Sequence, residues 1–238
     1  MKNFKRTNVD PRELEKFGAM ADLWWQPAGE FKALHDINPS RLGYVRDRAG
    51  LAGRKIIDVG CGGGLLSEAM ALEGALVTGI DMVESSLDIA RRHAAENGLH
   101  IEYRLGSAEQ CAAESPGQFD VVTCMELVEH VPEPASLVAS CAALLRPGGD
   151  LIFATVNRTL LSYLLVILAA EHLLGIVRKG THRYDKFVRP EELRQWGAQA
   201  GLQAVDVTGL RYIPVIGYAR LCRSLSMNYM MHLKKSEE

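Results

Sequence analysis

Short apolar runs alternate with helically spaced apolar rows along most of this chain. The runs predict strands at residues 56–57, 76–81, 101–105, 118–125, 150–156 and 203–210. Apolar positions three and four residues apart predict helices between them, at residues 65–72, 87–94, 134–145 and 187–201. Strands that alternate with helices indicate an α/β domain built on a mostly parallel sheet.

A helical segment is predicted ahead of the first strand. Asp10-Pro11 is suited to the N-cap and first turn of a helix, and apolar residues follow it at helical spacing. A second helix is expected to open near Pro39. We therefore divide the chain into an N-terminal helical cap, residues 1–50, and a larger domain, residues 51–238.

A glycine-rich turn follows the first strand and is the most informative stretch of the sequence. It runs from Asp58 through Gly60, Gly62 and Gly64. Glycine permits positive φ angles and lets main-chain N–H groups come close to a ligand. The next strand ends at Asp81, where a carboxylate is placed for the hydroxyls of a ribose. The turn therefore predicts a nucleoside-binding half of an α/β sheet.

The spacing of the glycines indicates which kind of nucleoside. A dinucleotide site needs a small residue three places after the second glycine, and this chain has Leu65 there. The G-x-G-x-G spacing resembles the first motif of class I S-adenosylmethionine (SAM)-dependent methyltransferases. A plain glycine-rich surface turn is the alternative. Ligands of such sheets bind outside the carboxyl ends of the strands, so Gly60, Asp81, Met125 and Asn157 are expected to face one crevice.

Two carboxylates and an imidazole follow the strand at residues 118–125. If that segment turns helically, Glu126, Glu129 and His130 share one face, since they lie three and four residues apart. Such a set can hold a divalent cation, with Mg²⁺ favoured by oxygen ligands. The alternative is a solvated helix start whose acids complement the helix dipole. His130 is also a candidate general base for a phenol, whose pKa lies near about 10.

Composition and charge exclude several other classes of protein. The 238 residues are 47% hydrophobic, enough for a sizeable core, and the net charge of −2 with a pI near 6.4 argues against nucleic acid as a partner. The five cysteines include no C-x-x-C pair, which argues against a zinc site and a disulfide framework. The N-terminal residues have no apolar signal segment, so a cytoplasmic location is expected.

Several motifs together are similar to the ubiquinone biosynthesis O-methyltransferase family. They cover the chain from about residue 8 to 232 and include Trp24-Trp25, Ile37-Asn38-Pro39, Asp58 to Gly64, Val121 to Glu126, Glu129-His130-Val131-Pro132, Pro147-Gly148-Gly149-Asp150 and Lys179-Gly180-Thr181-His182. The resemblance implies a Rossmann-like class I fold with a seven-stranded, mostly parallel sheet. It also implies SAM-dependent O-methylation of polyprenylated catechol-type intermediates at two steps of quinone synthesis.

The resemblance also implies roles for individual residues. It places a metal site, for Mg²⁺, at Glu126, Glu129 and His130, which are our candidate catalytic residues. The candidate cofactor-binding residues are Arg41, Asp58, Gly60, Gly62, Gly64, Asp81, Met82, Ser107, Ala108 and Met125. The turn at Ser107 lacks the aspartate that many class I enzymes use for the adenine amine, so that contact stays unassigned. Without the resemblance, Arg41 is an ordinary solvated arginine, and Trp24 and Trp25 favour packing over stacking on a substrate.

Two other functions compete with this interpretation. One is a methyltransferase that acts on carbon, nitrogen or a soluble small molecule. The other is a non-catalytic scaffold among other quinone-synthesis enzymes that keeps the cofactor fold. Intact Gly60, Asp81, Glu126 and His130 favour an enzyme.

An apolar insert at residues 159–183 is expected to dock on an anionic membrane. Its charge-free stretch is shorter than the roughly 20 residues that a membrane span needs. Basic residues flank it, and a prenylated substrate resides in the bilayer. The candidate membrane contacts are Leu164, Leu165, Ile167, Leu168, Arg178 and Lys179. The alternative is a buried helix or active-site lid; with docking, the protein would sit on the inner face of the membrane.

Overall fold

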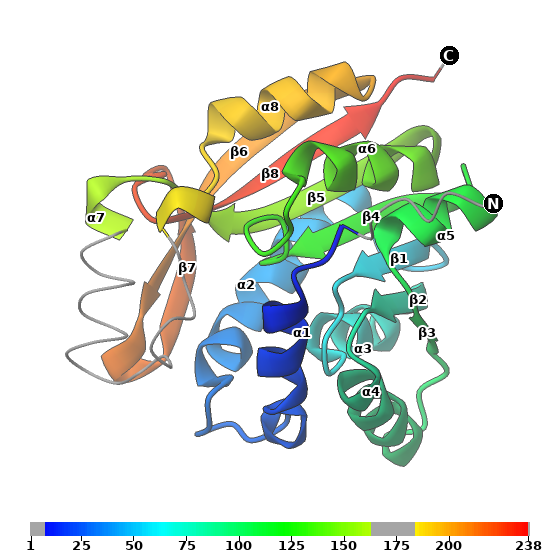
Figure 1. Cartoon of the computed structure of the whole chain (residues 1–238), viewed down its shortest axis with the longest axis vertical. Coiled ribbons are helices and arrows are strands. Elements are labelled where there is room, and N and C mark those ends of the chain that lie inside the picture. The colour runs from blue at the N-terminus through cyan, green and yellow to red at the C-terminus, as the bar shows by residue number, and fades with distance from the viewer. Residues whose placement is uncertain (1–7, 163–183, 238) are drawn as a thin grey trace.

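The computed structural model describes residues 8–162 and 184–237. These residues form an eight-stranded sheet in the order β3-β2-β1-β4-β5-β8-β6-β7 (Figure 1). The strands are β1 (Lys55–Val59), β2 (Leu76–Asp81), β3 (Glu102–Leu105), β4 (Phe119–Met125), β5 (Leu145–Val156), β6 (Leu202–Ile213), β7 (Tyr218–Cys222) and β8 (Asn228–Lys235). β1 to β5 pair in parallel, whereas β8, β6 and β7 pair antiparallel to their neighbours.

The α/β class and the parallel centre of the sheet agree with the sequence analysis. The sheet has one strand more than the seven that the resemblance implied. The additional strand is β7, which pairs with the second half of β6 from Gly209 to Ile213. The two strands form a hairpin because Gly217, with φ 61°, closes the turn between them.

Helices cover both faces of the sheet. They are α1 (Pro11–Gly18), α2 (Lys32–Ala49), α3 (Leu65–Leu72), α4 (Glu84–Glu96), α5 (Ala108–Glu114), α6 (Pro134–Leu144), α7 (Leu160–Ser162) and α8 (Pro190–Gln199), with short 3₁₀ turns η1 (Ala21–Leu23), η3 (Tyr184–Lys186) and η4 (Pro214–Ile216). Ile57 faces a core shared with α5, α6 and α8, and its neighbour Ile56 faces a core shared with α2 and α3. Neighbouring residues of β1 thus alternate between the two cores, as the pleat of a buried strand requires.

Two element boundaries differ most from the prediction. α2 begins at Lys32 rather than near Pro39, which lies inside the helix. Proline inside a helix removes one hydrogen bond, but the first turns of α2 are retained because Phe31 and Leu34 pack into a cluster around Trp24. β5 begins at Leu145 rather than at Asp150, and its pairing with β4 shifts register after Phe119 and resumes at Val121.

No helix among the described residues is both long and apolar enough to cross a membrane. The predicted membrane contacts Leu164, Leu165, Ile167, Leu168, Arg178 and Lys179 lie outside the described residues.

Candidate active site

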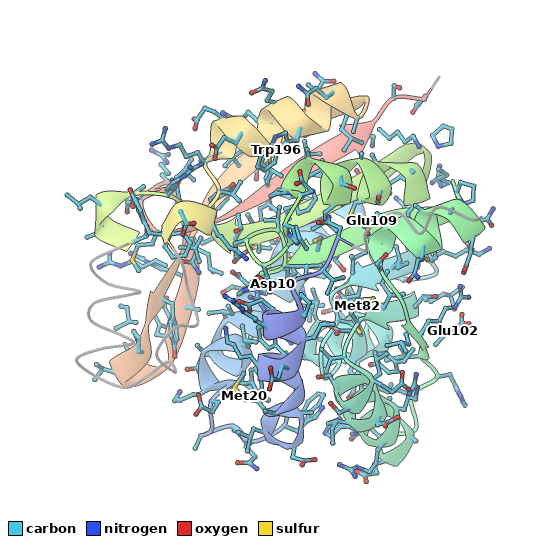
Figure 2. All side chains as sticks on the ribbon, in the orientation of Figure 1. Asp10, Met20, Met82, Glu102, Glu109 and Trp196 are labelled. Carbon is cyan, nitrogen blue, oxygen red and sulfur yellow. The ribbon has the colours of Figure 1, made fainter. Side chains whose placement is uncertain are left out.

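A cavity of about 510 Å³ lies at the carboxyl ends of β1, β2, β4 and β5. Its volume falls in the range of small-molecule binding sites. Figure 2 labels four residues that line the cavity: Asp10 at the N-cap of α1, Met20 in the turn before η1, Met82 directly after β2, and Glu109 in α5. The N-terminal helices and the sheet therefore enclose one space between them.

Most of the predicted site residues line this cavity. They are Arg41, Asp58, Gly60, Gly62, Asp81, Met82, Ser107, Ala108, Met125, Glu126, Glu129 and His130. Two predicted residues, Gly64 and Asn157, do not line the cavity. The Asn157 side-chain amide donates to the Leu225 carbonyl, and Val156, the residue before it, lines the cavity instead.

The glycines of the turn after β1 serve different purposes. Gly60 and Gly62 have positive φ, and Cβ atoms added to them would lie 2.8 Å from Leu127 and 2.3 Å from Trp24. Gly64 forms the N-cap of α3, and a Cβ there would lie 2.4 Å from the Tyr103 hydroxyl. Gly60 and Gly62 thus shape the cavity floor, whereas Gly64 allows α3 to pack against β3.

The two aspartates beside the turn hold it in place. Asp81 accepts hydrogen bonds from the backbone N–H groups of Gly62 (2.9 Å) and Val83 (2.8 Å). Asp58 accepts from the hydroxyls of Ser67 and Thr123, both at 2.7 Å. Burial raises the pKa of both carboxyls despite these hydrogen bonds. Because a carboxylate can accept about four hydrogen bonds, Asp81 can accept more than the two from Gly62 and Val83.

The end of β3 forms another part of the cavity wall. Ser107 caps α5 in a capping box with Gln110 and lines the cavity together with Ala108. The Glu109 carboxylate accepts from the Asn8 amide at 2.9 Å. No residue of this wall is assigned to the amine of the cofactor's adenine, so that contact remains unassigned.

The segment after β4 does not turn helically as the shared-face argument required. Among the described residues, Glu126 is the one non-glycine residue with positive φ, at 51°. This left-handed residue breaks the helical register, so Glu126, Glu129 and His130 do not stack on one face. Each of the three side chains instead has its own partner.

Glu126 pairs with Arg41 of α2. The guanidinium Nη2 donates to the Glu126 carboxylate at 2.8 Å, and the Arg41 residue is only 5% exposed. The solvated-arginine interpretation is therefore wrong. The Arg41 Nε atom is buried and has no hydrogen-bond partner, so this cavity-lining cation offers an unused donor to an anionic ligand.

Glu129 lies in a different environment. It is 4% exposed and accepts from the Thr155 hydroxyl at 2.8 Å. Burial, followed by the charge of the nearby Glu126, raises the pKa of Glu129 to about 8. The carboxyl is therefore mainly protonated at neutral pH.

His130 contacts two residues of α1. Its Nδ1 atom lies 3.1 Å from Glu13 Oε2, and its ring meets Phe17 edge-on at 5.5 Å between centroids. Across residues 8–162 and 184–237, no three His, Cys, Asp or Glu side chains are grouped so that they could hold a metal ion. The geometry brings the three predicted residues to one cavity but not to one point.

Apart from Arg41 of α2, residues of the N-terminal helices were not predicted to line this site. Glu13 and Phe17 come from α1, and Tyr212 reaches the cavity from β6. The signal was present, because the apolar face of α1 must cover some surface. Trp24 does pack: it is 8% exposed, stacks on Phe31 at 3.9 Å and donates to Ser86 Oγ at 3.0 Å.

Comparisons of the chain with known families and sequences agree with this geometry. Residues 39–207 match a family described as a methyltransferase domain. A ubiquinone biosynthesis O-methyltransferase of Pseudomonas aeruginosa is 50% identical over 229 residues, which cover 96% of this chain and 99% of that protein. Proteins of the same description from Azoarcus and from Bordetella pertussis are each 51% identical over 96% of this chain, covering 98% and 95% of their own lengths.

Solved structures show the same fold at lower identity. Magnesium protoporphyrin IX methyltransferase from Synechocystis with bound SAH gives a TM-score of 0.70 at 21% identity, covering 94% of this chain and 99% of that one. The same enzyme with bound SAM gives 0.67 at 18% identity, covering 98% and 100%. These structures establish the class I methyltransferase fold.

Proposed function

Because this chain belongs to the ubiquinone biosynthesis O-methyltransferase family and is a SAM-dependent O-methyltransferase, we propose how its cavity carries out the reaction. The acceptor is a phenolic hydroxyl of a polyprenylated catechol-type intermediate, at both O-methylation steps of ubiquinone synthesis. The observation that carries the proposal is the position of Glu126, Glu129 and His130 in the cavity wall directly after β4, beside the end of the cofactor strands.

The cofactor end of the cavity is formed by the turn after β1 and by Asp81. Gly60 and Gly62 line this end of the cavity and let Leu127 and Trp24 pack against the backbone of the turn. Asp81 accepts from ribose hydroxyls, and Arg41 offers its unpaired Nε–H to the ligand carboxylate. SAM, when bound, supplies a methyl group on a sulfonium sulfur. Asp58 fixes this end through Ser67 and Thr123.

The acceptor end must remove a proton, since a phenol oxygen attacks a methyl group well only as the phenolate. His130 takes this proton as the general base. Phe17 packs edge-on against the His130 ring, and Leu14 and Met20 add further apolar side chains to the cavity wall. The N-terminal cap, residues 8–50, therefore supplies part of the wall of the cavity in which the reaction takes place. This is the function that we propose for the cap.

A Mg²⁺ site at Glu126, Glu129 and His130 is the alternative route to the phenolate. Carboxylate oxygens and an imidazole nitrogen are suitable donors. The arrangement of the described residues does not fit it, because Glu126 pairs with Arg41 and Glu129 with Thr155. No catalytic step is therefore routed through a metal.

Methylation of a water-soluble catechol discriminates between these routes. With His130 as the base, EDTA-treated enzyme should keep its activity and His130→Ala should lose most of it while binding SAM normally. Loss of activity in EDTA that Mg²⁺ restores would favour the metal site. Full activity of His130→Ala would exclude both roles for this residue.

We also propose a cytoplasmic protein that binds the anionic inner face of the membrane. The hairpin of β6 and β7 supports this, because Val215 and Ile216 at its tip are 90% and 69% exposed. Arg211 and Arg220 lie opposite each other in its ladder, both exposed. Like charges in opposite positions disfavour the hairpin, and each cation near an anionic surface contributes about 1 kcal/mol.

Vesicle flotation tests this location. Wild-type protein should float with anionic vesicles and less so at high salt. Val215→Ser with Ile216→Ser should weaken binding, whereas Leu72→Ser, at a position that is 71% exposed on α3, should not. Deleting residues 161–177 tests the predicted insert separately, and flotation of no variant, wild type included, would exclude membrane docking.

A further inference from the structure

We propose that Glu13 is a positioning residue for His130, so that α1 completes the catalytic apparatus. The inference rests on the proposed role of His130 in the acceptor end of the cavity. Glu13 and His130 are 117 residues apart in the sequence, and both line the cavity. Glu13 Oε2 lies 3.1 Å from His130 Nδ1, with side chains that are 19% and 12% exposed.

The hydrogen bond has a defined direction. Glu13 Oε2 and His130 Nδ1 lie 3.1 Å apart, and a glutamate carboxyl is ordinarily a stronger acid than an imidazolium, so the carboxyl of this pair is the ionised partner. An ionised carboxylate only accepts hydrogen bonds. The hydrogen therefore resides on His130 Nδ1, and in the neutral imidazole the lone pair resides on Nε2.

The position of Glu13 is set by the fold and not by this pair alone. α1 starts at Pro11, and Asp10 caps it by accepting from the Arg12 N–H. Asn8 anchors the segment before the helix, because its side-chain oxygen accepts from the Glu133 N–H at 2.8 Å. Asp10 also pairs with Lys186 at 3.3 Å.

Fixing the tautomer matters for either role of His130. A base must present the Nε2 lone pair to the acceptor hydroxyl, and an imidazole ligand must present it to a metal. A carboxylate on the other nitrogen orients the ring and raises its basicity in both cases. Phe17, edge-on to the ring, restricts its rotation further. The role of Glu13 thus does not depend on which route forms the phenolate.

A rival explanation assigns Glu13 a purely structural role. Glu13 also pairs with Lys16 at 3.2 Å, three residues further along α1. Such partly exposed pairs contribute little to stability. Lys16→Met removes this pair and keeps the contact to His130, and it should leave turnover unchanged.

The experiment compares Glu13→Gln with Glu15→Gln in the full chain. Glu15 is exposed on the same helix, so its substitution makes the same change in charge away from the cavity. Turnover of a soluble catechol, cofactor affinity by calorimetry and thermal stability are measured for each. The tautomer of His130 is read from its ¹⁵N imidazole shifts at about pH 8, where an ordinary histidine is neutral, with His130→Gln used to assign the signal.

Glu13→Gln should lower kcat roughly 10- to 100-fold, as loss of an orienting carboxylate commonly does. It should also shift the His130 tautomer while cofactor affinity stays that of wild type. Glu13→Asp, which keeps the charge, should recover part of kcat and serves as the second variant if Glu13→Gln folds poorly.

Wild-type kcat in Glu13→Gln would overturn the proposal. So would a loss of kcat with an unchanged His130 tautomer, or an equal loss in Glu15→Gln. Failure of the proposed function looks different: His130→Ala would then stay active, whereas the tautomer would still report whether Glu13 orients the ring.

Discussion

Alanine substitutions at Gly62 and Gly63 in the turn after β1, compared with Gly98 after α4, separate two effects, steric overlap with Trp24 and backbone strain. Gly63 does not have a positive φ, but a Cβ there would lie 2.3 Å from Trp24 Cγ. Gly98 has φ 68° with nothing within 4 Å of its added Cβ. Gly62 combines both conditions, with φ 53° and a Cβ position 2.3 Å from the indole.

The magnitudes follow from these distances. Gly98→Ala should destabilise by about 1–2 kcal/mol, the cost of a left-handed residue. Gly63→Ala should cost about 1–3 kcal/mol through overpacking against a side chain that is itself held by Phe31 and Ser86. Gly62→Ala should cost about 2–5 kcal/mol, the sum of both effects. It should also weaken cofactor binding, since Gly62 lines the cavity and donates to Asp81.

Urea denaturation and calorimetry with SAM measure these effects. In a Trp24→Ala background the added cost of Gly63→Ala should vanish, because the overlapping ring is gone. If Gly63→Ala is as stable as wild type, or the cost persists without the indole, Trp24 does not lie on the turn and the account of this end of the cavity is wrong.

Three further changes test the polar contacts. Asp81→Ala should raise the SAM dissociation constant about tenfold to hundredfold, because a hydrogen bond to a charged group contributes about 1.5–3 kcal/mol; unchanged affinity by calorimetry would refute its role. Arg41→Met should destabilise by about 1.5–3 kcal/mol by leaving the Glu126 carboxylate unpaired, measured in urea, and equal stability would refute the pairing. Burial opposes ionisation of Asp206, but hydrogen bonds from Tyr44, Thr208 and Arg48 outweigh it and lower its pKa. Its contribution is therefore complete at neutral pH and is lost as the pH falls through the folded-state pKa, below the ordinary value of about 3.9. The stability gap between wild type and Asp206→Asn should accordingly close in acid, and a gap that is constant with pH would contradict this.

The local patterns of the sequence were sufficient to predict the nucleoside-binding half of the fold. The positions of the turn from Asp58 to Gly62 and of Asp81 are set within a single β-α-β unit, β1-α3-β2. The apolar periodicity of that unit and the spacing of its glycines therefore identify them. The antiparallel edge was less predictable. β7 exists because the chain reverses at Gly217, and that reversal depends on a partner strand rather than on its own apolar pattern.

The acceptor end shows where sequence spacing is insufficient. Three- and four-residue intervals place Glu126 with His130 only if the backbone is helical, and the positive φ of Glu126 breaks that condition. The contacts that replace it come from distant segments. Arg41 is 85 residues from Glu126, and Glu13 is 117 residues from His130. Such pairs arise from tertiary packing, which no local period encodes.

Single-turnover methyl transfer from methyl-labelled SAM to a catechol tests whether this cavity methylates a phenolic oxygen with His130 as the base. The purified chain should place the label on the phenolic oxygen. His130→Ala should bind SAM but transfer the label far more slowly, and Asp81→Ala should recover transfer at saturating SAM. SAM binding without transfer, or a label found on carbon, would contradict it.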